Sequence, residues 1–270
     1  MGEFDNNERS KLFRRADILQ KTSAWMAILC AAVALFLIIA WANGKDTDEI
    51  YLGGLNLGRD MANWHPVLMT AGMLLCGVAS MMTYRVIDVP KTYSKYLHAL
   101  LHTAAIVFIF FGLYLEFTSK NQTNKHEGGG HYANLYTMHS LVGLSTVILY
   151  ALNYFMALFY FLAGVASNAL RKAYLPKHVF VGTFALVLIV ASIESGIMDM
   201  QKIKGCSIAV DEVNIDPAST YHDLQDGCKV ANGAGILTLL CGLFAWYAMH
   251  DYVQGDGNAD ADDHLLGNKY

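Results

Sequence analysis

Charged residues are scarce in this sequence. Lys, Arg, Asp and Glu make up 16% of its 270 residues, whereas soluble domains carry about a quarter. Hydrophobic residues reach 54%, and the formal net charge is −4. No stripe of Lys and Arg runs along the chain, so nothing indicates nucleic-acid binding. The composition argues against a soluble domain and indicates a membrane protein.

The N-terminal segment lacks two common targeting signals. Residues 1–23 are highly charged and contain no small-residue cleavage site, which argues against a signal peptide. The start, MGEFDN, has no Ser or Thr at its sixth position, so it does not fit the N-myristoylation pattern. We expect residues 1–23 to form a cytosolic arm ahead of the first membrane helix.

Six apolar runs are long enough to cross a bilayer, which takes about 20 helical residues. They cover residues 24–42, 64–84, 96–117, 136–163, 178–198 and 230–249. The sequence therefore predicts an all-α fold, a six-helix transmembrane bundle over residues 24–250. Lys and Arg gather in the N-terminal arm and after the second and fourth runs, which places both termini in the cytosol. The acidic residues 251–270 are predicted to be a disordered cytosolic tail.

Two features agree with this orientation. The glycosylation sequon at residues 121–123 lies in a segment assigned to the non-cytosolic side. Cys206 and Cys228 lie in a second such segment, where an oxidising compartment would let them pair. Two free thiols are the alternative. The three cysteines inside the spans are expected to act as small packing residues.

Five of the ten histidines lie within the predicted spans: His65, His98, His102, His139 and His178. Ionisable side chains at membrane depth are costly and point to function. The predicted orientation places His65 and His139 near the outer face. It places His98 and His178 near the cytosolic face. Each level thus receives two imidazoles, from alternate helices.

Two facing imidazoles with no cysteine or carboxylate beside them suit a haem with two axial histidines. Such an iron has no open site for oxygen, so the chemistry would be electron transfer. Since the bilayer core is about 30 Å thick, two such irons would lie roughly 20 Å apart. His102 lies one helical turn deeper than His98, about 6 Å, on nearly the same face. It is either a neighbour of the inner haem or an ordinary core histidine.

Five stretches resemble the cytochrome b561 family: NWHPVLM (63–69), SMMTYR (80–85), KYLHALLH (95–102), NLYTMHS (134–140) and LPKHVFVG (175–182). Proteins of this family have six helices and carry electrons from cytosolic ascorbate across a membrane. The resemblance covers roughly residues 60–200 and implies two haem b groups within the central four helices. It assigns His65 and His139 to the outer haem and His98 and His178 to the inner one. It also suggests a homodimer.

The resemblance further implies a cytosolic ascorbate site made by Lys91, Lys95 and Arg171, with Arg85 as a weaker candidate. Ascorbate is a monoanion at neutral pH, and these cations stand at the cytosolic mouth beside the inner histidine pair. Arg can grip an anion with two hydrogen bonds, whereas Lys acts as a point charge. Without the family, the same residues could reflect only the positive charge of cytosolic loops.

On the opposite side, Phe117 and Tyr136 match family positions near the electron acceptor. Thr118 stands where the family usually has a histidine. Monodehydroascorbate and a ferric chelate are therefore both candidate acceptors. His126 and His131, in the loop that follows, are either substitutes for that histidine or solvated loop residues.

We therefore predict an ascorbate-dependent transmembrane oxidoreductase, acting as a monodehydroascorbate or ferric-chelate reductase. Plasma membrane, secretory vesicle, vacuole and lysosome are all candidate locations. A histidine-lined proton or metal transporter without haem is the alternative. A structural or receptor membrane protein that merely binds haem is a third hypothesis. Glu194, near the outer end of the fifth run, is expected to pair with Lys202, to assist proton release or to face water.

Overall fold

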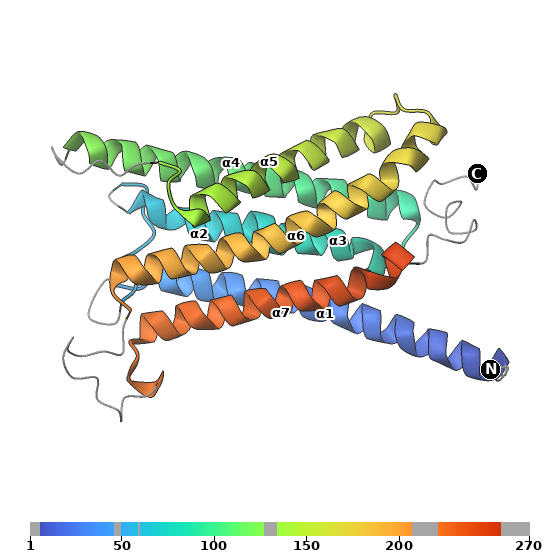
Figure 1. Cartoon of the computed structure of the whole chain (residues 1–270), viewed down its shortest axis with the longest axis horizontal. Helices are drawn as coiled ribbons and strands as arrows, with labels where there is room; N and C mark the ends of the chain where they lie inside the picture. Colours follow the sequence, from blue (N-terminus) through green and yellow to red (C-terminus); the bar gives the residue numbers. More distant parts are fainter. Residues whose placement is uncertain (1–5, 46–49, 59, 127–133, 207–220, 255–270) are drawn as a thin grey trace.

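The structure, a computed structural model, describes residues 6–45, 50–58, 60–126, 134–206 and 221–254. These residues are mostly helical and contain no β-strand. Six of their helical segments are long and apolar enough to span a membrane. The predicted all-α, six-span fold is confirmed, and the chain is a multi-pass membrane protein. Figure 1 shows the helices running side by side along the long axis of one bundle.

The described residues form seven α-helices and four further helical segments, all of which except η4 contribute to the six spans. In chain order they are α1 (Asn6–Asn43), η1 (Met61–Asn63), α2 (Trp64–Met69), η2 (Thr70–Cys76), α3 (Gly77–Val86), α4 (Lys91–His126), α5 (Met138–Ala157), η3 (Leu158–Leu162), α6 (Asn168–Lys204), η4 (Tyr221–Asp223) and α7 (Asp226–Gln254). The second span is composite, because the π-helical η2 joins α2 to α3 without a break.

The helices extend beyond the apolar runs that predicted them. Most of the N-terminal arm belongs to α1, and residues 251–254 of the predicted tail continue α7. Residues 255–270 lie outside the described part of the chain. At α6, the helix begins ten residues before His178, which therefore lies well inside the helix and not at its mouth. Hydropathy marks the lipid-buried stretch, whereas helices end where capping groups satisfy their backbone.

Local signals set the ends of α5, which carries His139, and of α6, which carries His178. The Thr137 side chain accepts a hydrogen bond from the Ser140 backbone N–H at the start of α5, at 3.2 Å. The Ser167 hydroxyl caps α6 in the same way, accepting from the N–H of Leu170 at 3.3 Å. Such caps satisfy backbone donors that the helix leaves open. Gly205, with φ of 82°, ends α6 in the left-handed conformation that favours glycine.

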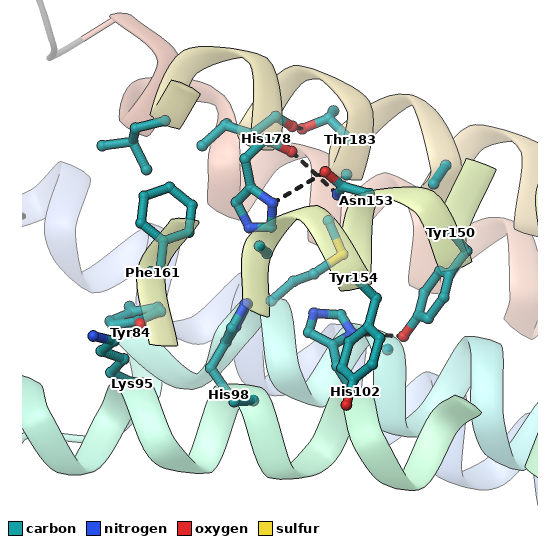
Figure 2. Close-up of a pocket in the computed structure, with 18 of the residues that line it drawn as sticks. Tyr84, Lys95, His98, His102, Tyr150, Asn153, Tyr154, Phe161, His178 and Thr183 are labelled. Carbon is teal, nitrogen blue, oxygen red and sulfur yellow. Dashed lines mark hydrogen bonds between the residues drawn. The ribbon is translucent and has the colours of Figure 1, made fainter. Parts of the chain in front are cut away.

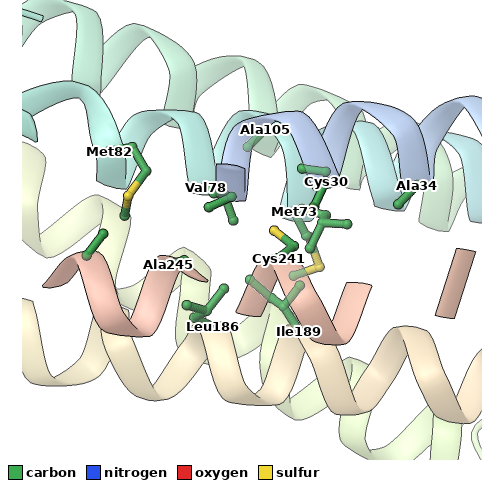
Figure 3. Packing of buried hydrophobic residues seen from close by; sticks show 14 of the residues in the cluster. Cys30, Ala34, Met73, Val78, Met82, Ala105, Leu186, Ile189, Cys241 and Ala245 are labelled. Carbon is green, nitrogen blue, oxygen red and sulfur yellow. The ribbon is translucent and has the colours of Figure 1, made fainter. Parts of the chain in front are cut away.

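The helices form layers, and the predicted histidine pairs lie among the central helices. In Figure 1, α1 and α7 form the lower layer, α4 and α5 the upper one, and α2, α3 and α6 lie between them. The α1–α7 contact is close because both helices present small residues to the bundle, including Ala27, Ala31, Ala34, Ala234 and Ala245. Small side chains let membrane helices approach closely. Figure 3 shows this packing continuing through Met73, Leu186 and Ile189.

A disulfide joins the residue that follows the C-cap of α6 to the first turn of α7. It links Cys206 to Cys228, with the two Cα atoms 6.0 Å apart. This confirms the predicted pairing. Cys30, Cys76 and Cys241 are free thiols, and Cys30 and Cys241 are buried in the α1–α7 contact. The start of α1 and the end of α7 lie at the same end of the bundle (Figure 1), as an even number of crossings requires.

Candidate functional site

Two pairs of histidines face each other across the bundle at two levels. His65 on α2 and His139 on α5 have ring centres 6.1 Å apart. His98 on α4 and His178 on α6 have ring centres 6.3 Å apart. Figure 2 shows the rings of His98 and His178 pointing toward one another. The structure thus brings together the same two pairs that helix orientation predicted.

These spacings match two imidazoles bound to opposite sides of one metal ion. A metal–imidazole bond is about 2 Å long, and the ring centre lies about 1 Å behind the bonded nitrogen. Two such rings therefore have centres roughly 6 Å apart. Among the described residues, no cluster of three or more His, Cys, Asp or Glu side chains could chelate a bare ion. The donor set suits an iron whose remaining positions are filled by a porphyrin.

All four histidines hold the same tautomer. In each ring Nδ1 lies next to a carbonyl oxygen, which can only accept, so Nδ1 carries the proton and Nε2 keeps its lone pair. The bonds run from His65 to Gly112 O (3.2 Å), from His98 to Ser80 O (2.9 Å), from His139 to Ser192 O (2.9 Å) and from His178 to Asn153 Oδ1 (3.1 Å). Ligating histidines in metal sites characteristically donate their second ring nitrogen in this way.

Asn153 holds His178 with both ends of its amide. Its oxygen accepts from Nδ1, while its Nδ2 donates to the backbone oxygen of His178 at 3.4 Å (Figure 2). The second bond fixes which end of the amide faces the ring. Ser80 supports His98 similarly, since its hydroxyl also lies 3.0 Å from Nδ1 and donates to the His98 backbone oxygen at 2.8 Å.

His139 packs directly on the backbone of α6. A Cβ atom added to Gly196 would lie 2.8 Å from Cε1 and 2.9 Å from Nδ1 of His139. Unbonded carbon atoms pack about 3.5–4.0 Å apart. Only glycine therefore leaves the imidazole its place at this position.

His102 differs from the four paired histidines. Its Nδ1 shares a hydrogen bond with the hydroxyl of Tyr150, which is only 7% exposed. Its ring centre lies 4.6 Å from that of His98, edge to face. Figure 2 shows His102 beside Tyr150 and Tyr154, away from the ring of His178. His102 thus lies next to the inner pair and deeper along α4, and its role stays a prediction.

A cavity of about 260 Å³ surrounds the inner pair and opens among α3, α4, α5 and α6. His98, His102 and His178 line it together with Tyr84, Tyr150, Tyr154 and Phe161. All four predicted cations, Arg85, Lys91, Lys95 and Arg171, also line this cavity, and none of its lining residues is acidic. The arrangement favours an anion next to the inner histidines.

Unpaired donors support an anionic ligand. Arg171 Nε is buried and has no hydrogen-bond partner among the described residues. Trp64 Nε1, next to His65 in the chain, is in the same state. Buried donors without partners are costly, and an anion such as a porphyrin carboxylate or ascorbate would remove that cost. Arg85 differs, because its Nη1 donates to Gln20 Oε1 on α1 at 2.9 Å.

The predicted acceptor residues are less closely grouped. Phe117 is half-buried near the outer end of α4, while Tyr136 is 68% exposed just before α5. Next to Phe117 on α4, Glu116 and Lys120 form a salt bridge of 2.9 Å. The side chains of His126 and His131 lie outside the described part of the chain.

Sequence reasoning missed the groups that hold the histidines. Ser80 and Asn153 are polar residues inside apolar spans, and that property alone was the available signal. Gly112 and Ser192 act through backbone oxygens, for which the sequence has no signal. The salt bridge between Glu116 and Lys120 could also have been predicted, because opposite charges four residues apart pair on a helix.

The expected ion pair between Glu194 and Lys202 is not formed, and Glu194 Oε1 is buried without a partner in the described structure.

The fold and the paired imidazoles define a class: a helical membrane protein with two pairs of facing histidines among its spans. Sequence comparison supplies the family. The profile of eukaryotic cytochrome b561 matches residues 64–203, a range that includes all four paired histidines. This chain belongs to the cytochrome b561 family, whose cofactor is haem b.

Curated relatives agree with this assignment. The human lysosomal membrane ascorbate-dependent ferrireductase CYB561A3 is 36% identical, over 70% of this chain and 73% of its own length. The plasma membrane ascorbate-dependent reductase CYBRD1 of Xenopus laevis is 31% identical, over 66% of this chain and 59% of its own length. The ascorbate-specific transmembrane electron transporter 2 of Zea mays is 32% identical, over 66% and 71%.

Proposed function

We propose that this protein carries electrons from cytosolic ascorbate, through two b-type haems, to an acceptor on the other side of the membrane. The observation that carries the proposal is the pair of imidazole spacings, 6.1 and 6.3 Å, with every Nδ1 held by a carbonyl oxygen. Ascorbate as donor is supported by the names of the relatives. A ferric chelate is the favoured acceptor, because the human relative is named a ferrireductase, and monodehydroascorbate is the second candidate.

In this proposal His65 and His139 hold the outer haem, and His98 and His178 hold the inner one. Haem iron supplies a one-electron carrier whose potential depends on its axial ligands and surroundings. The protein supplies the rest. The four imidazoles are each held at Nδ1 and present their Nε2 lone pairs in fixed directions. The apolar packing around them excludes water. Fixed, water-poor surroundings lower the reorganisation that accompanies each change in charge.

The ascorbate site is proposed at the cationic cavity. Lys91 and Lys95 lie one turn apart at the start of α4, and Arg171 faces them from the start of α6. The unpartnered Arg171 Nε is available to an anion, and Arg binds planar anions with a fork of donors. Positive charge at the cavity mouth attracts ascorbate and helps retain it while it gives up an electron. Arg85, tied to Gln20, is assigned a supporting charge.

The proposed orientation puts residues 1–23 and 251–270 in the cytosol, flanking the membrane domain of residues 24–250. The disulfide at the opposite end of the bundle supports this, because disulfides persist in oxidising compartments. The relatives are named as lysosomal and plasma membrane proteins, and we propose one of these membranes. A homodimer stays a prediction from the family.

The transporter alternative lacks comparable support. A histidine that relays protons must exchange protons at both ring nitrogens, whereas each paired histidine here has Nδ1 committed to a carbonyl oxygen. Fixed tautomers suit ligands and not relays.

Vesicles test the proposal. Purified protein is inserted into liposomes loaded with ascorbate, and a ferric chelate is added outside. We expect iron reduction outside and an absorption spectrum of ascorbate-reduced haem. His65→Ala is expected to stop electron exit, while His222→Ala, at a side chain 96% exposed outside the spans, leaves it unchanged. A colourless protein, or equal rates with and without internal ascorbate, overturns the proposal.

A further inference from the structure

A carboxylate at membrane depth is left unused by the proposed electron path. Glu194 lies in the outer half of α6, and its Oε1 is buried without a hydrogen-bond partner in the described structure. Its other oxygen rests on α7, since a Cβ atom on Gly235 would lie 2.9 Å from Oε2. Glycine at 235 thus makes the room that Glu194 occupies. Such a group inside a membrane helix is costly and indicates a role.

Polar groups also lie between Glu194 and the outer end of the bundle, where α6 meets α7. Gln201, seven residues further along α6, lies on the same helix face. Its Nε2 donates to Asn232 Oδ1 at 2.8 Å and to the Cys228 backbone oxygen at 3.3 Å. Asn232 is one turn from Gly235 on α7. The contact between α6 and α7 therefore carries polar groups from the disulfide inward, over about 10 Å at 1.5 Å per residue.

Glu194 also lies at the level of the outer histidine pair. The residues on either side of it along α6 contact His139: the Ser192 backbone oxygen accepts from Nδ1, and Gly196 packs against the ring. These two face α5, whereas Glu194 faces α7 on the opposite side of the helix. A helix is about 10–12 Å across, so the carboxylate is on that order from His139, with low-dielectric protein between them.

We propose that Glu194 is a proton-binding site coupled to the outer electron site. The Glu194 carboxylate takes up one proton from non-cytosolic water when an electron arrives at the His65–His139 level. It releases that proton when the electron leaves to the acceptor. The added proton balances the added electron, so the membrane interior gains no net charge. This inference rests on the proposed function, because it requires a redox group between those two histidines.

The expected coupling is moderate. Two charges about 12 Å apart, at an effective dielectric constant near 20, change each other's binding constant roughly tenfold. Proton binding to Glu194 should therefore be roughly tenfold tighter when the outer site is reduced. A tenfold change in a one-electron equilibrium corresponds to 59 mV.

Other ionisable groups near this end of α6 differ from Glu194 in their partners or in their surroundings. On α7, Asp226 and Lys229 form a salt bridge of 3.0 Å at the outer end. Tyr51 packs against the apolar cluster that contains Ile197, and His139 on α5 has Nδ1 committed to Ser192. On α6 itself, Asp199 lies five residues further out and provides a matched control.

The test measures the midpoint potential of the outer haem against pH in the purified, haem-loaded protein. Between about pH 5 and pH 8, the wild-type potential should fall by about 59 mV in total, and so should that of Asp199→Asn. Glu194→Gln should show no such fall. A reduced-minus-oxidised infrared spectrum of the wild type should show a protonated-carboxyl band that Glu194→Gln lacks.

An equal pH dependence in wild type and Glu194→Gln overturns the inference, as does a wild-type infrared spectrum without the carboxyl band. The infrared result does not depend on how well a variant folds. Failure of the inference is distinct from failure of the proposed function. A protein with two haems and a pH-independent outer potential contradicts only the role of Glu194, whereas a protein without haem contradicts both.

Discussion

Replacing Gly196 with alanine tests whether His139 is held in a geometry fit for a metal ligand. The new Cβ would lie 2.8 Å from Cε1 and 2.9 Å from Nδ1 of the imidazole. Unbonded carbons pack at about 3.5 Å or more, so the ring must retreat by roughly 0.7 Å. Metal–ligand distances tolerate only about 0.2 Å. The ring and the hydrogen bond to the Ser192 backbone therefore cannot both keep their places.

We expect Gly196→Ala to weaken the outer haem at least tenfold, in line with the 10–100-fold cost of disturbing groups that orient a ligand. Alanine favours a helix over glycine by about 1 kcal/mol, so a weaker α6 cannot explain the loss. The assay is the haem content of the purified protein, with reduced spectra that distinguish the two haems.

Gly182→Ala is the matched control on the same helix. Its Cβ would lie 3.6 Å from Asn153 Nδ2, which is ordinary van der Waals contact, and far along α6 from His139, so the outer haem should be retained. If Gly196→Ala keeps a full outer haem with an unchanged spectrum, then His139 is not held as the structure indicates, and its assignment as a ligand loses its main geometric support.

Three further predictions follow from single contacts. Asn153→Leu removes the acceptor of the inner imidazole and should lower inner-haem affinity by about 10–100-fold; haem titration of the apoprotein measures this, and an unchanged affinity contradicts it. Arg171→Ala should slow reduction by ascorbate with little loss of haem, because it removes a cation from the cavity. Lys172→Ala changes a residue outside the cavity lining and should leave the rate of reduction unchanged. Stopped-flow spectra measure both rates, and equal rates in the two variants would refute the assignment. Cys206→Ser opens a loop with a sequence separation of 22 and should cost about 3 kcal/mol of stability; thermal loss of haem reports it, and an unchanged midpoint would show that the disulfide is dispensable.

The number of spans and the pairing of the histidines could be predicted from the sequence, because both depend on one-dimensional patterns. Long uncharged runs give the crossings, and alternating direction places residues from alternate spans at the same depth. His65 and His139 each lie near the start of a span that begins at the non-cytosolic face, so they share one level. The cationic site was predicted from the family resemblance, because the charge asymmetry alone is equally consistent with ordinary cytosolic loops.

Other features depend on contacts between spans and could not be predicted from the sequence. The carbonyl partners of the four histidines all come from other helices, and three of them, on Gly112, Ser80 and Ser192, are backbone oxygens. No residue type encodes a backbone oxygen. The π-helical η2 within the second span follows from packing against α1 and α4 and has no proline or charge to announce it. Glu194 had an apparent partner in Lys202, and only the geometry showed it unpaired and resting on α7.

The number of haems per chain tests the central claim most directly. We predict a ratio of two in the purified wild-type protein, with low-spin signals from two distinct bis-imidazole irons. His65→Ala should lose one signal and His178→Ala the other, leaving one haem per chain in each. A ratio of one or zero in the wild type, or loss of the same signal in both variants, would contradict the account of two independent imidazole pairs.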